Sequence, residues 1–237
     1  MKVEICFSPL LYPAYQNNDS IVVVVDIFRA TTTMCAAFAN GAKYIIPVES
    51  IEEAKEYKDK GYLVGGERNV KRVDFADFGN TPSEYTPAKV SGQEIVFTTT
   101  NGTRAIEMAK DSYCLTIGSF SNLSAIANFC IAEQKDVLVL CSGWKNRFNI
   151  EDSLFGGALA SLLISRGGYE VDSDAVQVAL SIWRAAMPDI NLYIEQTEHI
   201  KRLAANDLLG VAKYCLETDT VQVVPVYNKE YKKLEVK

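Results

Sequence analysis

Two segments of the chain place threonines, an arginine and the predicted start of a helix directly after a hydrophobic run. They are VVVVDIFRATTTM (22–34) and VFTTTNGTRA (96–105). A helix N-terminus offers unpaired N–H groups and about half a positive charge, so it favours an anion such as phosphate. Arginine adds a fork of donors that matches phosphate or sulfonate oxygens. The repeated pattern therefore predicts an anion site, although threonine also suits strands and often caps a helix without binding anything.

Four carboxylates are predicted to lie at the ends of strands, where they could hold a divalent cation. Asp26 ends an apolar strand, Glu67 follows the run LVGG, and Glu151 and Asp152 stand where a strand over 136–143 gives way to a helix. An unpaired carboxylate beside a wholly apolar strand would be costly, so Asp26 is the candidate on which the interpretation depends most. Oxygen ligands of this kind suit Mg²⁺, which also shares substrate oxygens. Each carboxylate could instead cap a helix or pair with an arginine.

Two phosphatase chemistries that use a covalent intermediate are disfavoured. The segment CSGWKNR (141–147) has the C-x5-R spacing of cysteine phosphatases, in which a thiolate attacks phosphorus. No histidine precedes Cys141, no Ser or Thr follows Arg147, and a Trp-Lys pair occupies a loop that usually needs small residues. An aspartyl-phosphatase mechanism at Asp26 would need a second acid two residues later, where Phe28 stands.

The only histidine, His199, is predicted to have a surface or capping role rather than a catalytic one. A single histidine excludes a metal centre with several histidines and argues against a Ser-His-Asp triad. The chain contains neither a P-loop motif nor GxGxxG, so its sequence gives no support for nucleotide binding.

Composition excludes several classes of partner. The 237 residues carry a net charge of −6 without a basic block, so a nucleic-acid partner is not expected, and no apolar run is long enough for a membrane span. We expect a cytoplasmic protein whose six cysteines are buried and reduced. An anionic substrate must be attracted by local cations or a metal, because the overall charge repels it. A homo-oligomer is compatible with the sequence, since closed homo-oligomers are common.

Hydrophobic runs and helical patterns alternate along most of the chain. Continuous apolar runs, typical of strands buried on both faces, occur at 3–8, 21–26, 44–48, 63–66, 94–99, 114–119, 136–143 and 221–226. Helical patterns occur at 31–42, 50–61, 102–111, 121–134, 151–168, 172–187 and 197–217. This alternation predicts an α/β fold with a largely parallel sheet between layers of helices.

The same alternation indicates how the chain is organised. No linker interrupts it, so one domain over 1–237 is expected, with a helix-rich part from about residue 151. The polar segment 66–93 shows little periodicity. Because long loops without structure are usually functional, it is a candidate lid or recognition loop.

Several blocks in order resemble the successive motifs of the 2-phosphosulfolactate phosphatase (ComB-like) family. They are VVVDIFRATTTMCAAFANGAKYIIPV, GGER, DFGNTPSEYT, IVFTTTNGTRAI, GSFSNLSAIA and FNIEDSLFGGAL, and the resemblance extends from about residue 20 to VVPVY near the end. It implies a three-layer α/β/α fold with a mostly parallel mixed sheet. It also implies a phosphoric monoester hydrolase that converts 2-phosphosulfolactate to sulfolactate and phosphate with Mg²⁺, a step toward coenzyme M.

Carried onto this chain, the resemblance and the motif chemistry give a set of candidate site residues. Candidate catalytic residues are Asp26, Arg29 and Arg104, and the candidate metal ligands are Asp26, Glu67, Glu151 and Asp152. Candidate substrate-binding residues are Thr31, Thr32, Thr33, Arg68, Asn80, Thr100, Asn101, Gly102, Thr103 and Ser119. Two alternatives stay open: a phosphatase of this fold that acts on another small phosphorylated acid, and a non-catalytic anion-binding protein.

Overall fold

The strands form one mixed sheet of ten, in the order β1–β8–β2–β7–β9–β10–β3–β6–β4–β5, in a computed structural model that describes residues 1–237. They are β1 (Val3–Cys6), β2 (Ile21–Val25), β3 (Tyr44–Pro47), β4 (Leu63–Arg68), β5 (Lys71–Arg72), β6 (Glu94–Thr98), β7 (Cys114–Gly118), β8 (Val137–Cys141), β9 (Pro225–Asn228) and β10 (Lys233–Val236). Strands β1, β8, β2 and β7 are parallel to one another, and so are β3, β6 and β4. The predicted mostly parallel sheet is confirmed.

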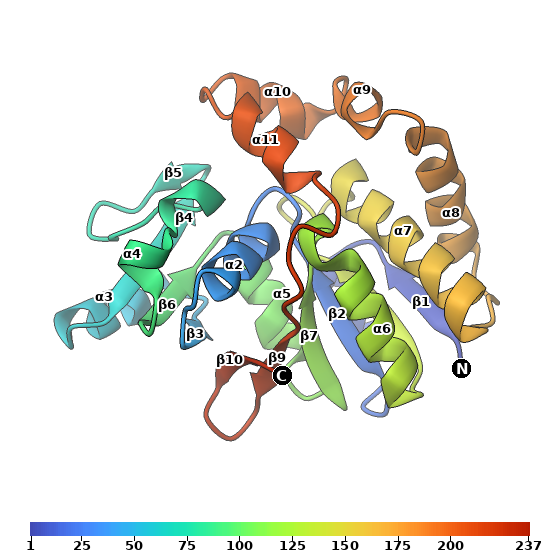
Figure 1. The fold of residues 1–237 in the computed structure, drawn as a ribbon, viewed down its shortest axis with the longest axis horizontal. Coiled ribbons are helices and arrows are strands. Elements are labelled where there is room, and N and C mark those ends of the chain that lie inside the picture. Colours follow the sequence, from blue (N-terminus) through green and yellow to red (C-terminus); the bar gives the residue numbers. More distant parts are fainter.

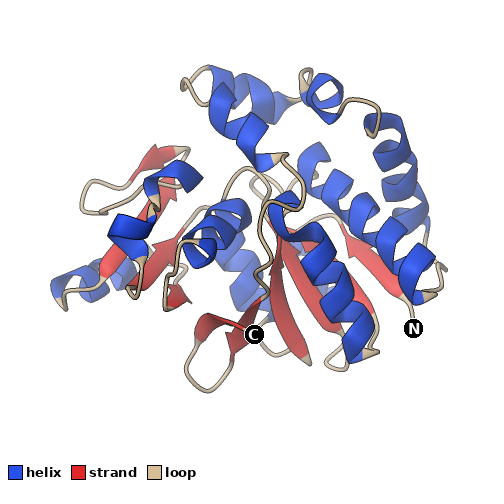
Figure 2. Ribbon diagram, in the orientation of Figure 1, coloured by secondary structure: helices blue, strands red, loops and turns tan.

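Helices cover both faces of the sheet and complete the three layers (Figures 1 and 2). The α-helices are α1 (Tyr12–Tyr15), α2 (Ala30–Ala39), α3 (Ile51–Asp59), α4 (Pro87–Val90), α5 (Gly102–Ala109), α6 (Leu123–Glu133), α7 (Ile150–Gly167), α8 (Asp174–Ala186), α9 (Ile190–Ile194), α10 (Glu198–Ala204) and α11 (Leu209–Cys215). Short 3-10 turns lie at Pro9–Leu11, Pro82–Glu84 and Phe120–Asn122. Figure 1 shows α9, α10 and α11 above the upper ends of the central strands.

The central strand β2 is fully buried on both faces, as its unbroken valine run predicts. Ile21, Val23 and Val25 belong to a core that they share with α6, α7 and α8. Val22 and Val24 belong to a second core with α2 and α5. The residue that follows this strand, Asp26, therefore lies at a fixed point between two helix layers.

A C-terminal hairpin joins the two parallel groups of strands. Strand β9 pairs antiparallel with β7 at one position, Thr116 with Val226, and β10 pairs antiparallel with β3 at one position, Leu234 with Ile45. The two strands of the hairpin pair with each other over their full lengths. The side chain of Leu234 is fully buried in the core shared with α2 and α5.

Several segments differ from the sequence prediction. The run 221–226 enters the sheet only at Pro225, because the N–H of Val221 donates to Ser121 O, in the 3-10 turn before α6, instead of to a strand. Strand β10 was not predicted at all. The helical segment 197–217 is two helices, separated by Asp207 in the left-handed backbone region (φ 58°).

The segment 66–93 contains strand β5, a 3-10 turn and α4 rather than a structureless loop. Phe78 and Tyr85 are buried, and the Tyr85 hydroxyl donates to Gly79 O (2.8 Å). Gly65 leaves space for this hydroxyl, since a Cβ there would lie 2.0 Å from it. The segment is therefore packed against β4 and β6 through aromatic side chains. No helix in the structure combines the length and apolar character that a membrane crossing requires.

Gly157 sets the close approach of α7 to α8, which gives the first testable prediction. A Cβ at Gly157 would lie 2.2 Å from Ala179 O and 2.8 Å from Trp183 Cβ, so the two helices would have to separate. We expect Gly157→Ala to lower the free energy of unfolding by about 1–3 kcal/mol, the usual cost of overpacking, in a urea titration.

The matched control is Gly210→Ala in α11, where a Cβ would meet nothing within 4 Å. Alanine is the better helix former, so the control should be neutral or slightly stabilising. Equal stability of Gly157→Ala and the parent protein would contradict the close contact.

Candidate active site

The turn after β2 is held by Asp26 and Thr31. The Asp26 N–H donates to Thr31 Oγ1 (3.0 Å), and this hydroxyl donates back to Asp26 O (3.0 Å). The Ala30 N–H donates to Asp26 Oδ1 (3.3 Å), so the carboxylate caps the first turn of α2. The peptide bond between Phe28 and Arg29 in this turn is cis. Asp26 is 7% exposed, and Oδ2 accepts no hydrogen bond.

The turn between β6 and α5 lies against the turn between β2 and α2, and these two turns are called the corners of the site. A Cβ at Gly102, the first residue of α5, would lie 2.7 Å from Ala30 Cβ and 3.0 Å from Asp26 Oδ2. Only glycine leaves the carboxylate this space. The corner is closed by Thr99 and Thr103, because each N–H donates to the other residue's hydroxyl (3.3 and 3.2 Å). The two threonine-and-arginine segments therefore lie against one another, as their shared pattern predicts.

Glu67, at the end of β4, joins a third segment to these corners. Its Oε1 accepts from the Thr100 N–H and its Oε2 from the Val70 N–H, both at 2.8 Å. The buried Arg29 donates to Val70 O (3.1 Å) in the same loop and to Thr81 Oγ1 (2.8 Å), at the start of the 3-10 turn Pro82–Glu84. The carboxylate and the arginine thus hold the loop after β4 beside the two corners.

Asp152, in the first turn of α7, uses both oxygens to hold backbone and side-chain N–H groups. Its Oδ1 accepts from the Ile27 N–H (2.9 Å), and its Oδ2 accepts from the Gly143 N–H (3.0 Å) and Asn149 Nδ2 (2.9 Å). The residue therefore ties the loop between β8 and α7 to the turn that follows Asp26.

The neighbouring Glu151 is buried and paired with the only histidine of the chain. Its Oε1 lies 2.5 Å from His199 Nδ1, and the two side chains are 1% and 5% exposed. The Phe28 ring packs edge-on against the imidazole, with ring centroids 5.4 Å apart. Helix α10 thus brings His199 to the same strand end as Asp26.

Burial dominates the electrostatics of these groups. It raises the pKa of the Asp26 carboxyl to about 6, while the nearby His199 opposes the rise and the charge of Glu67 adds to it. Burial also raises the pKa of the Asp152 carboxyl, and the hydrogen bonds from Ile27 and Asn149 oppose that rise by stabilising the ionised form. Asp26 is therefore largely ionised near neutral pH but sensitive to charges bound close to it.

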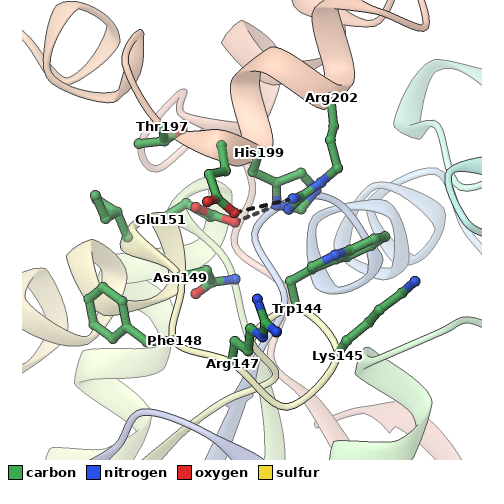
Figure 3. Close-up of a pocket in the computed structure, with 11 residues that line it drawn as sticks. Trp144, Lys145, Arg147, Phe148, Asn149, Glu151, Thr197, His199 and Arg202 are labelled. Atoms are coloured by element: carbon green, nitrogen blue, oxygen red, sulfur yellow. Dashed lines mark hydrogen bonds and ion pairs between the residues drawn. The ribbon is translucent and has the colours of Figure 1, made fainter.

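A cavity of about 690 Å³ opens beside the Glu151–His199 pair (Figure 3). It is formed by the loop between β8 and α7, the start of α7, and α10. Its lining residues are Trp144, Lys145, Arg147, Phe148, Asn149, Ile150, Glu151, Thr197, Glu198, His199 and Arg202. The loop also contacts the corner before α5, because the Lys145 N–H donates to Asn101 Oδ1 (3.1 Å).

Most predicted substrate-binding threonines have hydrogen-bond partners within their own corners. The hydroxyls of Thr31, Thr32 and Thr103 each donate to a carbonyl oxygen in the preceding turn. The Thr33 hydroxyl is buried without a partner. These side chains shape the corners, and the Ala30, Thr31 and Thr103 N–H groups at the starts of α2 and α5 are also bound within them.

The predicted arginines lie in different settings. Arg68 donates to Glu49 O and to Thr98 Oγ1, both at 2.8 Å, so its guanidinium braces the ends of β4 and β6. Arg104 makes no hydrogen bond or ion pair in the structure. It stands two residues after Gly102, about 200° round the helix axis from the glycine that faces Asp26. Its catalytic role stays a prediction.

Asn80 and Ser119 occupy separate positions. Asn80 is buried next to Thr81, the partner of Arg29, and its Oδ1 has no hydrogen-bond partner. Ser119 hydrogen-bonds Ser121 and Asn122 in its own turn before α6. Asn80 therefore lies beside the group that holds Arg29, whereas the partners of Ser119 are local.

The four predicted metal ligands differ in the oxygens that they leave available. Glu67 and Asp152 accept N–H groups on both oxygens, whereas Asp26 and Glu151 each keep one oxygen without a hydrogen bond. No group of three or more His, Cys, Asp or Glu side chains is placed to hold an ion by itself. Such a donor set fits Mg²⁺, which is usually held by one or two carboxylates, waters and substrate phosphate. The magnesium site stays a prediction.

The prediction of a surface or capping role for His199 is wrong, because the side chain is buried against Glu151 and Thr197 caps α10. The sequence feature that could have indicated its burial is the spacing of His199 from Leu203 in α10. These residues, at i and i+4, share one helix face, and both are buried. Trp144 and Arg202 were also missed, since nothing in the sequence pattern places α10 over the loop after β8.

Cys141 is fully buried at the end of β8, and burial raises its pKa well above the usual thiol range. A thiol in this state is a poor nucleophile. All six cysteines are free, and five of them are buried. The structure therefore supports the argument against a cysteine-phosphatase mechanism.

The family model described as 2-phosphosulpholactate phosphatase matches residues 6–230. A protein of Caldanaerobacter subterraneus subsp. tengcongensis is 34% identical over 208 residues, 86% of each chain. One of Thermotoga maritima is 36% identical over 203 residues, covering 86% of this chain and 87% of its own. One of Clostridium acetobutylicum is 32% identical over 232 residues, covering 96% and 98%. All three are named probable 2-phosphosulfolactate phosphatase.

The burial of Cys141 predicts that this thiol is inert in the folded protein. We expect a thiol reagent such as Ellman's reagent to leave Cys141 unmodified under native conditions, because the group is inaccessible and its thiolate is scarce. Mass spectrometry of peptides identifies the labelled residue. Labelling in denaturant is the positive control, and rapid native modification of Cys141 would contradict the structure.

Proposed function

The chain belongs to the 2-phosphosulpholactate phosphatase family, whose activity is that of a phosphoric monoester hydrolase, and from this premise we propose its reaction. The protein hydrolyses 2-phosphosulfolactate to sulfolactate and phosphate with Mg²⁺, as a step of the coenzyme M biosynthetic type. The proposal places the reaction in the cytoplasm.

The observation that carries this proposal is the contact of Gly102 with Asp26 and Ala30. It brings the N-termini of α2 and α5 to one point beside a buried carboxylate. N–H groups and helix dipoles directed at one point favour a phosphate there. Because the carboxylate would repel a bare phosphate, a cation between the two is the arrangement that the charges favour.

The residues of the chain take the following roles in this proposal. Asp26 and Glu151 would hold Mg²⁺ through the carboxylate oxygens that accept no hydrogen bond, and Glu67 and Asp152 position the surrounding backbone through their N–H partners. Bound Mg²⁺ would neutralise charge on the phosphate oxygens and act as a Lewis acid. Arg29 holds Val70 in the loop after β4 and Thr81 beside the site.

Stabilisation of the charge that develops on the phosphoryl group supplies most of the rate enhancement. The positive ends of the α2 and α5 helix dipoles lie beside the phosphoryl oxygens. Arg104, which has no partner of its own, turns toward the bound anion. The two helix ends are fixed before the substrate arrives, so only Arg104 has to change position when the anion binds.

A panel of phosphorylated acids tests the reaction and the identity of the substrate. We expect Mg²⁺-dependent phosphate release to be fastest from 2-phosphosulfolactate and to stop when EDTA removes the metal. Phosphate release is measured with 2-phosphosulfolactate, 2-phospholactate and 2-phosphoglycolate. Faster turnover of another acid would indicate a different substrate, and binding without turnover would indicate a non-catalytic protein.

Asp26→Asn tests the carboxylate at the centre of the site. The amide keeps the shape but loses the charge, so we expect the turnover number to fall at least about 100-fold, as when a group that stabilises the transition state is removed. Steady-state phosphate release measures the effect. The matched control is Asp19→Asn, an exposed aspartate before β2, which should retain full activity. Near-normal turnover of Asp26→Asn would refute the role given to this residue.

A further inference from the structure

We infer that the cavity in Figure 3 binds a second acidic group of the substrate, a sulfonate or a carboxylate, between Arg147 and Arg202. This inference rests on the proposed function and adds the residues that determine which phosphorylated compounds are accepted. Under it, phosphate occupies the corners at Asp26, and the rest of the substrate extends toward α10.

The walls of the cavity contact the segments that form the proposed phosphate site. Its wall includes Glu151 and His199, and the His199 ring contacts Phe28, two residues after Asp26. On another side, the Lys145 N–H donates to Asn101 Oδ1, at the start of the α5 corner. A small molecule with two anionic groups can therefore place one in each part of the site.

Arg202 is held in position but is not committed to a strong partner. Its guanidinium carbon lies 4.3 Å from the centre of the Trp144 ring, a cation–π contact that fixes the side chain over the cavity. Its Nε is buried without a hydrogen-bond partner. Its ion pair with Glu198 is long (3.8 Å), and the Glu198 side chain is 90% exposed, so water screens the attraction. An anion can therefore compete for this guanidinium.

Arg147 faces the cavity from the opposite side, as Figure 3 shows. Trp144 and Arg147 exchange two backbone hydrogen bonds (3.0 and 2.9 Å), which close a tight turn. Gly143 permits this turn, because its φ is +60° and a Cβ would lie 2.2 Å from Arg147 O. The Arg147 side chain makes no hydrogen bond or ion pair. The turn therefore fixes an unpaired cation opposite Arg202.

The charges around the cavity favour an anion in spite of the net charge of −6. Lys145, Arg147 and Arg202 line it, against Glu151 and Glu198. One oxygen of Glu151 is already paired with His199. Two guanidinium groups facing each other match the planar or tetrahedral oxygens of a carboxylate or sulfonate. The second acidic group of the substrate is the ligand that this arrangement fits.

Substrate preference tests the inference. The variants Arg202→Gln and Arg147→Gln are assayed with 2-phosphosulfolactate and with phenyl phosphate, which has no second acidic group. We expect the ratio of kcat/KM for the first substrate to that for the second to fall at least about tenfold in each variant, the scale of one lost charge-assisted hydrogen bond. The matched control, Arg184→Gln at an exposed position of α8, should keep the parent ratio.

An unchanged ratio in both variants, or a proportional loss with both substrates, would overturn the inference, since the arginines would then not recognise the second group. If the parent protein releases no phosphate from either substrate, the proposed function fails. Calorimetric titration with sulfolactate, which needs no turnover, then decides the inference by itself. Binding that weakens at least tenfold in Arg202→Gln supports it, and no binding by the parent protein, or equal binding by both, overturns it.

Discussion

The site depends on the contact between Gly102 and the Asp26 turn. Strands β2 and β6 are separated by four other strands in the sheet, yet the residues that follow them are in contact. Any side chain at position 102 would displace either Ala30 or the carboxylate. The backbone of α5 therefore fits directly against Asp26, and each further element is held relative to that pair. Glu67 binds the Thr100 N–H just before α5, and Asp152 binds the Ile27 N–H just after Asp26.

Much of the fold could be predicted because its strands are continuous apolar runs. Strand β2 is buried on both faces, and its sequence shows this directly. The hairpin β9–β10 could not be predicted in the same way, since each of its strands pairs with the rest of the sheet at a single position and carries polar residues. Asp26 could be identified because a carboxylate directly after a buried strand is costly to bury unless it has a partner or a function.

The parts of the site that could not be predicted depend on contacts between segments that are distant in the sequence. Arg29 and Arg68 both follow strand residues, yet one reaches across the site to Thr81 while the other braces Glu49 and Thr98. No local pattern distinguishes them. His199 was misplaced for a related reason: its burial depends on α10 lying above the strand ends and on Glu151 as a partner, neither of which is encoded nearby in the chain.

The C-terminal hairpin has a consequence for how the molecule folds. Pairing between Leu234 and Ile45 links positions near opposite ends of the sequence, and it is part of the only bridge between the two parallel groups of strands. Contacts of such long range carry a large loop-closure entropy and form slowly. Each parallel group of strands can first pack against the helices that are close to it in the sequence. The two groups become one sheet when the hairpin pairs with both. Assembly of the catalytic corners, which belong to different groups, is therefore expected to be among the last events in reaching the native state.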